Sequence, residues 1–187
     1  MILRTEYQAP REHLAERLNL SYEDLVHIVF ESETARRAAL GEITEDQHWQ
    51  SVAAKLGRSD TQIGGLRDEF FGGDVLDRGL LDFIRGLRRA RRTGLLSNGW
   101  LDLRKYLVKN RIQDAFDSIV ISAEVGMLKP DPRVYQLALK ELNAGPKEAV
   151  FVDDTPANVQ AAAELGMCGV LFTSAEQTRR EVEKALA

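Results

Sequence analysis

The feature that most constrains the fold of this chain is a run of four apolar residues, 149–152, that ends in two aspartates. An uninterrupted apolar run of this length is typical of a strand that is buried on both faces of a parallel sheet. Thr155 and Pro156 follow the aspartates, and they suit the cap and the first position of a helix. The sequence therefore predicts a strand-to-helix junction at Asp153 and Asp154.

The same alternation of short apolar strands and amphipathic helices extends over most of the chain after Gly73. The expected strands cover residues 93–96, 118–121, 149–152 and 169–172, and the expected helices cover residues 80–91, 101–109, 132–142, 156–165 and the segment from Ala175 onward. This alternation predicts right-handed βαβ units in an α/β fold with a doubly wound, mostly parallel sheet.

The chain before residue 75 has a different pattern, in which helices are indicated and strands are hard to find. Ser21 and Thr44 each begin a sequence typical of a helix N-terminal cap, and a further helix is expected over residues 60–70. After the Thr44 cap, apolar residues recur at the spacing of one helix face, at Trp49, Val52, Ala53 and Leu56. We therefore expect three regions: a short segment over 1–9, a helical bundle over 10–75 and an α/β core over 76–187.

Charge and cysteine content exclude several classes of protein. The chain has 25 Lys+Arg against 29 Asp+Glu and a formal net charge of −4, whereas non-specific nucleic-acid binding needs a basic face. Its longest apolar run, over residues 167–172, is far shorter than the ~18 residues of a membrane span. Cys168 is the only cysteine and cannot form an internal disulfide, so a reducing, cytoplasmic location is expected. Neither a nucleic acid nor a membrane is an expected partner.

Three strand ends carry residues with unusual chemistry. The first is Ser97-Asn98-Gly99-Trp100, the second is Lys129-Pro130, and the third is Asp153-Asp154. Ligands bind outside the carboxyl ends of the strands in open parallel sheets, so these positions are expected to converge. Each has an ordinary alternative: a Ser/Asn/Gly turn, a solvated lysine, and two acids favoured by a helix dipole.

The residue types indicate a site for phosphate and a divalent cation. Adjacent carboxylates at Asp153 and Asp154 repel one another unless a cation joins them, and oxygen ligands suit Mg²⁺. The Ser97 hydroxyl and the backbone N–H groups after it can hold a phosphate oxygen. Pro130 restricts Lys129 to an extended conformation, where its ammonium group can neutralise a phosphate.

In this order and spacing the three motifs resemble those of the haloacid dehalogenase-like hydrolase superfamily. Ser97-Asn98 resembles the second family motif, Lys129-Pro130 the third, and Asp153-Asp154 the fourth. The helical region before residue 75 resembles the cap of subfamily I, which is inserted after the first core strand. Within that superfamily, the chain resembles the N-terminal phosphatase domains of soluble epoxide hydrolases and bacterial sugar phosphatases.

The resemblance implies a Mg²⁺-dependent phosphatase that acts on a small phosphorylated metabolite through an aspartyl-phosphate. It assigns catalytic roles to Lys129, Ser97 and Asp154, and metal binding mainly to Asp154 with Asp153 beside it. The substrate-binding residues it implies are Ser97, Asn98, Gly99, Trp100 and Lys129.

One departure from the family pattern concerns the nucleophile. The first family motif, Asp-x-Asp or Asp-x-Gly-Gly at the end of the first strand, is absent, and residues 1–6 resemble those that follow it. We expect either a coding sequence that starts roughly 10–15 residues late or a naturally shortened relative. The family's first strand lies between the strands that end at Leu96 and Val152. Its loss predicts a gap of roughly 10 Å between two unpaired strand edges, which a homodimer could cover.

The missing motif predicts an inactive or strongly impaired enzyme and leaves two alternatives. One is a 2-haloacid dehalogenase-like enzyme, which the serine and lysine motifs suit equally well. In the family that reaction uses no metal, so Asp153 and Asp154 favour the phosphatase. The other alternative is a non-catalytic protein that binds phosphate or a partner through the retained pocket.

Overall fold

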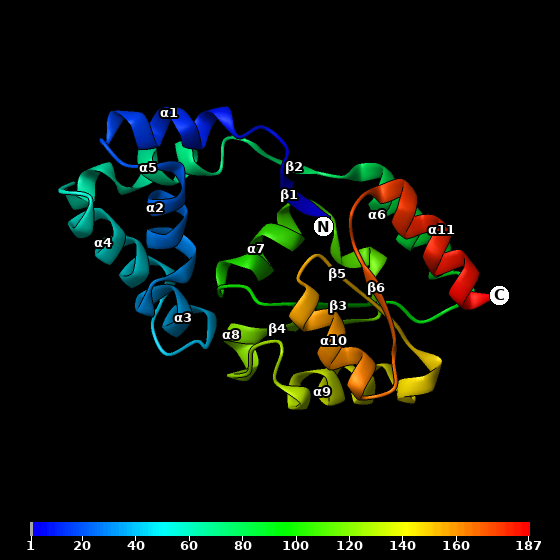
Figure 1. Cartoon of the computed structure of the whole chain (residues 1–187). Coiled ribbons are helices and arrows are strands. Elements are labelled where there is room, and N and C mark those ends of the chain that lie inside the picture. The colour runs from blue at the N-terminus through cyan, green and yellow to red at the C-terminus, as the bar shows by residue number, and fades with distance from the viewer. Residues whose placement is uncertain (1) are drawn as a thin grey trace.

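The computed structural model of the chain describes residues 2–187. Met1, the first residue of the expected 1–9 segment, lies outside the described residues. Figure 1 shows a group of helices from the first part of the chain beside an α/β body formed by the rest. The antiparallel pair β1 (Leu3–Thr5) and β2 (Asp74–Leu76) lies where the chain leaves and re-enters the α/β body.

The N-terminal helical bundle has caps at the two predicted positions. Its helices are α1 (Ala9–Arg17), α2 (Tyr22–Val26), α3 (Glu33–Ala39), α4 (Glu45–Lys55) and α5 (Ile63–Phe70), with a π-helix η1 (His27–Glu31) and a 3₁₀ helix η2 (Asp60–Gln62). The Ser21 side chain accepts a hydrogen bond from the Asp24 N–H at the start of α2. Thr44 and Gln47 form a capping box at the start of α4. Both caps satisfy N–H groups that would otherwise have no intrahelical partner.

The bundle has its own apolar core. Leu14, Leu25, Trp49 and Phe70 are fully buried within it, so the predicted apolar face of α4 lies in this core. The Arg11 side chain donates to the Phe70 carbonyl at 2.9 Å and to the Asp74 carboxylate at 2.8 Å. These bonds fix the bundle to β2.

The α/β body contains every strand and helix predicted after Gly73, with ends displaced by a few residues at most. Its elements are α6 (Arg78–Leu87), β3 (Gly94–Ser97), α7 (Asp102–Lys109), η3 (Gln113–Ala115), β4 (Ser118–Ile121), α8 (Ser122–Val125), α9 (Pro132–Leu142), η4 (Pro146–Glu148), β5 (Val150–Asp153), α10 (Pro156–Glu164), β6 (Cys168–Leu171) and α11 (Ala175–Leu186). The predicted α/β class is therefore confirmed.

The parallel strands form two separate pairs. Strand β3 pairs with β4 and β5 pairs with β6, whereas within residues 2–187 no strand joins β3 to β5. A cavity of about 480 Å³ lies between the two pairs. The expected gap is thus present, and the predicted single sheet is divided at that point.

The short strands β1 and β2 are not predicted by the sequence. Each has three residues, too few to show the two-residue period of a strand, and β2 lies at the end of a region with a helical pattern.

In the described part of the chain, no helix combines the length and the apolar character needed to cross a membrane.

Candidate active site

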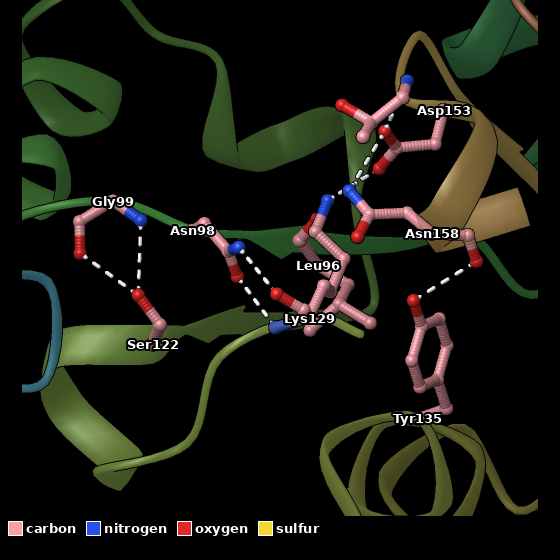
Figure 2. A network of polar contacts seen from close by, with 9 residues as sticks. Leu96, Asn98, Gly99, Ser122, Lys129, Tyr135, Asp153 and Asn158 are labelled. Carbon is pink, nitrogen blue, oxygen red and sulfur yellow. Dashed lines mark hydrogen bonds and ion pairs between the residues drawn. The ribbon is translucent and has the colours of Figure 1, made fainter. Parts of the chain in front are cut away.

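Lys129 lies where the carboxyl ends of β3 and β5 meet. Its Nζ donates to the Leu96 carbonyl at 3.0 Å and to Asp153 Oδ2 at 2.6 Å (Figure 2). Leu96 and Ser97 end β3, and Asp153 ends β5. The loop between α8 and α9 therefore places one ammonium group against both strand ends.

Asp153 is buried and accepts hydrogen bonds from three directions. Besides Lys129, the Thr155 N–H and the Asn158 amide donate to its Oδ1 at 2.9 and 3.0 Å. Burial by itself raises the pKa of Asp153, but the bonds and the charge of Lys129, with the other two donors, outweigh burial and lower that pKa. Asp153 is consequently a carboxylate at neutral pH.

Asp154 is exposed, although it is the next residue in the chain. Within residues 2–187, no group of three or more His, Cys, Asp or Glu side chains is arranged to hold a metal ion. Mg²⁺ needs few protein carboxylates because it keeps several waters, so an exposed carboxylate that water and a phosphate can reach fits this ion. The ammonium group of Lys129 already contacts Asp153 Oδ2, which makes Asp154 the more accessible oxygen donor of the two.

Asn98 fixes the main chain of Lys129. Its Nδ2 donates to the Lys129 carbonyl at 2.9 Å, and its Oδ1 accepts from the Lys129 N–H at 2.8 Å. One side-chain amide therefore bonds to both the C=O and the N–H of a single residue (Figure 2). The second and third motifs are therefore joined directly, through a contact that the sequence alone does not indicate.

Gly99 is held by Ser122, which lies outside the three predicted motifs. Ser122 Oγ accepts from the Gly99 N–H at 3.0 Å and donates to the Gly99 carbonyl at 3.2 Å. Ser122 is the first residue after β4, so the strand-end rule that selects Ser97 also selects Ser122. This side chain fixes the loop that follows β3. The prediction that Lys129 lies at a strand end is wrong, because the short helix α8 stands between β4 and the loop that carries Lys129.

Trp100 lies against the N-terminal helical bundle. Its Nε1 donates to the Ala35 carbonyl at 3.3 Å, and its ring centroid is 4.7 Å from that of His48. His48 is fully buried, and burial lowers its pKa to about 4. The indole therefore joins the loop after β3 to α3 and α4.

Asn158 and Tyr135 complete the buried contacts around Asp153. Asn158 lies in the first turn of α10, and its carbonyl accepts from the Tyr135 hydroxyl at 2.9 Å. Burial, and then the nearby charge of Asp153, raise the pKa of Tyr135 to about 12, so it stays a donor. The sequence signal for Asn158 is a polar residue one turn after an aspartate at a strand end.

Comparisons with known proteins identify the family of the chain. Residues 4–166 match the family model described as haloacid dehalogenase-like hydrolase. Bifunctional epoxide hydrolase 2 of Sus scrofa is 30% identical over 166 residues, covering 79% of this chain and 30% of that protein, so this chain spans less than a third of that relative. The sesquiterpene phosphatase astK of Aspergillus oryzae is 28% identical over 170 residues, covering 88% of this chain and 85% of that protein.

The fold is also shared with a solved enzyme. A HAD family enzyme from Bacteroides thetaiotaomicron, crystallised in complex with magnesium and inorganic phosphate, aligns with a TM-score of 0.73 and 22% identity. The alignment covers 92% of this chain and 89% of that one. Since the family model spans most of the chain and the fold agrees, this protein belongs to the haloacid dehalogenase-like hydrolases.

Proposed function

We propose that the site at the ends of β3 and β5 binds the phosphoryl group of a small phosphate monoester together with Mg²⁺. The observation that carries this proposal is the ammonium group of Lys129, which two strand ends hold at 3.0 and 2.6 Å. A cation fixed in this way stabilises charge on phosphoryl oxygens without having to reorganise. A phosphatase among the relatives, and a structural neighbour in complex with magnesium and phosphate, support the same chemistry.

The loop after β3 supplies the neutral donors in this proposal. The Ser97 hydroxyl and the Asn98 N–H bind one phosphoryl oxygen, and Lys129 binds another. The Gly99 N–H is held by Ser122, so Gly99 shapes the loop. Trp100 contacts the bundle and so sets the distance between the bundle and the bound phosphate. The rest of the substrate would lie between the two.

The two aspartates have different tasks. Asp153 holds the ammonium group of Lys129 in place. Asp154, which is exposed, provides the main protein oxygen for Mg²⁺, with Asp153 beside it. When bound, Mg²⁺ would offset the repulsion between the phosphate and the carboxylates around it.

Hydrolysis through an aspartyl-phosphate also needs a carboxylate in line with the phosphorus. Among residues 2–187, the carboxylates at the ends of β3 and β5 are Asp153, whose oxygens accept from three donors, and Asp154, which we assign to the metal. We therefore expect the 187-residue chain to bind phosphate in a Mg²⁺-dependent manner and to turn over phosphate monoesters slowly or not at all.

Calorimetric titration with inorganic phosphate, with and without Mg²⁺, tests the binding site. Phosphate is expected to bind at least tenfold more tightly with Mg²⁺, and both Asp154→Asn and Lys129→Met to remove this gain. Glu176→Gln, which changes an exposed acid on α11, is the matched control. Equal phosphate binding by all four proteins would refute the site.

Hydrolysis of p-nitrophenyl phosphate tests the assignment of the carboxylates. Little or no turnover is expected from the 187-residue chain at any Mg²⁺ concentration. Appreciable turnover that Asp154→Asn abolishes would show that a carboxylate of this chain attacks the phosphorus, and would overturn that part of the proposal.

A further inference from the structure

The outer edge of β6 is open to solvent. Strand β6 pairs with β5 on one side, and within residues 2–187 no strand pairs with its other side (Figure 1). Cys168, Gly169 and Leu171 of this strand are exposed. Because glycine has no side chain, the exposed surface of Gly169 is main chain. The hydrogen-bonding groups of this edge are therefore within reach of another molecule.

The register of β6 on β5 determines which main-chain groups face outward. A strand in a parallel pair points the N–H and C=O of alternate residues toward each side. The Phe172 N–H donates to the Asp153 carbonyl of β5 at 2.8 Å, so Phe172 and, two residues before it, Val170 face β5. Gly169 and Leu171 alternate with them, and their N–H and C=O groups point away from β5.

Gln177 of α11 covers the carboxyl end of this edge. Its Nε2 donates to the Leu171 carbonyl at 3.0 Å, and its Oε1 accepts from the Thr173 N–H at 3.2 Å. One side-chain amide thus takes the place of a neighbouring strand at this end. The two bonds involve neither the Leu171 N–H nor any group of Gly169, so the rest of the edge stays open.

The other outer edge of the α/β body, on β4, is covered by a charged side chain. Arg104 of α7 donates from Nη2 to the Ile119 carbonyl at 3.0 Å, and its Nε donates to Glu124 at 2.9 Å, which holds the guanidinium group in place. Charged side chains and prolines are common means of keeping sheet edges from pairing. Between Glu164 and Glu176 the sequence has neither. The edge of β6 therefore lacks the protection that the edge of β4 has.

We propose that two copies of this chain associate through antiparallel pairing of their β6 strands about a two-fold axis at Gly169. Each Gly169 N–H then donates to the carbonyl of Gly169 of the partner subunit, and each Leu171 N–H donates to the carbonyl of Met167 of the partner subunit. This register leaves both Gln177 contacts intact. An axis at Val170 would instead need the Leu171 carbonyl, which already accepts from Gln177.

A second copy fits this edge because a two-fold axis brings two identical edges together in antiparallel order. Leu171, 39% exposed, then lies opposite Met167 of the partner subunit, and apolar cross-strand pairs of this kind stabilise a sheet. Like charges do not meet across the strands, because β6 is uncharged. This inference concerns assembly and does not depend on the proposed phosphate chemistry.

Sedimentation equilibrium of the 187-residue chain, from low micromolar to submillimolar concentration, tests the association. We expect a reversible dimer that forms as the concentration rises. Hydrogen exchange at the amides of Gly169 and Leu171 is expected to be at least tenfold slower at the highest concentration than at the lowest. The amide of Val170, which faces β5, is expected to change little.

The matched variants Leu171→Pro and Leu171→Ala separate strand pairing from apolar contact. Proline removes the outward N–H and is tolerated at an edge position whose N–H faces solvent, whereas alanine keeps that N–H. We expect at least tenfold weaker dimerisation of Leu171→Pro than of Leu171→Ala, with both folds verified by circular dichroism. Gly169 is left unchanged because a Cβ there would lie 2.8 Å from Val159 Cγ1.

Cross-linking at Cys168 tests the register. Cys168 is the only cysteine of the chain and is exposed. With the axis at Gly169, strand geometry places the two Cys168 Cα atoms roughly 8 Å apart. A short bis-maleimide is therefore expected to cross-link the wild-type dimer and to leave Leu171→Pro largely monomeric.

Three results would overturn the proposal. The first is a monomer over the whole concentration range, and the second is equal dimerisation of Leu171→Pro and Leu171→Ala. The third is a dimer in which exchange slows at Leu96 and Val152 instead of Gly169 and Leu171, because the copies would then meet at the gap between β3 and β5.

Discussion

Replacement of Lys129 by methionine tests the buried ion pair on which the site is built. The side chains of Lys129 and Asp153 are 8% and 3% exposed, so both charges are largely removed from water in the folded protein. The variant leaves the Asp153 carboxylate buried with only the Thr155 N–H and the Asn158 amide as donors. Removal of one partner from a buried pair costs about 3–5 kcal/mol, and we expect a loss of that size in the free energy of unfolding at pH 7.

The loss should depend on pH in a defined direction. In the wild-type protein the pKa of Asp153 lies below its ordinary value of 3.8, so the pair stabilises the protein above pH 3.8 and ceases to do so as pH falls through the lowered pKa. Without Lys129, burial is opposed only by the Asn158 amide and the Thr155 N–H, so we expect a higher pKa of Asp153 in the variant than in the wild-type protein. The variant should therefore regain stability relative to wild type as pH falls from 7 toward 4.

Urea unfolding at several pH values measures both effects. The double variant Lys129→Met/Asp153→Asn has no buried charge at this position and should be more stable at pH 7 than the single variant. Lys105→Met, which breaks an exposed Lys–Asp pair with side chains 82% and 36% exposed, is the matched control and should change stability little. A loss below about 1 kcal/mol for Lys129→Met, the same at every pH, would refute the reasoning.

Two further predictions concern neighbouring residues. The pKa of His48 is lowered from 6.5 to about 4 by burial, so unfolding should become easier as pH falls across that interval, by up to about 3 kcal/mol; His48→Phe should reduce this dependence in urea unfolding, and an unchanged pH profile would contradict it. Asn98→Ala removes both side-chain bonds to the Lys129 backbone and should cost about 1–2 kcal/mol in unfolding free energy; unchanged stability would show that Lys129 is fixed by other contacts.

The sequence predicts the strand ends well because local pattern determines them. The strand at Ser118–Ile121 and the helix at Pro132–Leu142 have the predicted bounds. Both are fixed by signals within the segment, a β-branched apolar run in one case and an Asp-Pro start in the other. The gap between β3 and β5 is predicted differently, from the order of strands that the family resemblance implies.

The different environments of the two aspartates could not be predicted from their types. Asp153 and Asp154 are alike in sequence, but one accepts from Lys129 and the other is exposed. That difference depends on where a loop 24 residues away places its lysine. The hydrogen bonds of Asn98 to Lys129 and of Trp100 to Ala35 join residues 31 and 65 positions apart. Such contacts are set by tertiary packing.

The most direct test of the site is the position of a bound divalent cation. Mn²⁺, a paramagnetic substitute for Mg²⁺, can be titrated into ¹⁵N-labelled protein in the presence of inorganic phosphate, with amide line widths as the readout. We predict that the amides of Asp154, Ser97, Asn98 and Lys129 broaden first, because the ion lies at the ends of β3 and β5. First broadening at another acidic surface, such as the exposed Glu176 on α11, with these four amides unaffected, would contradict the account.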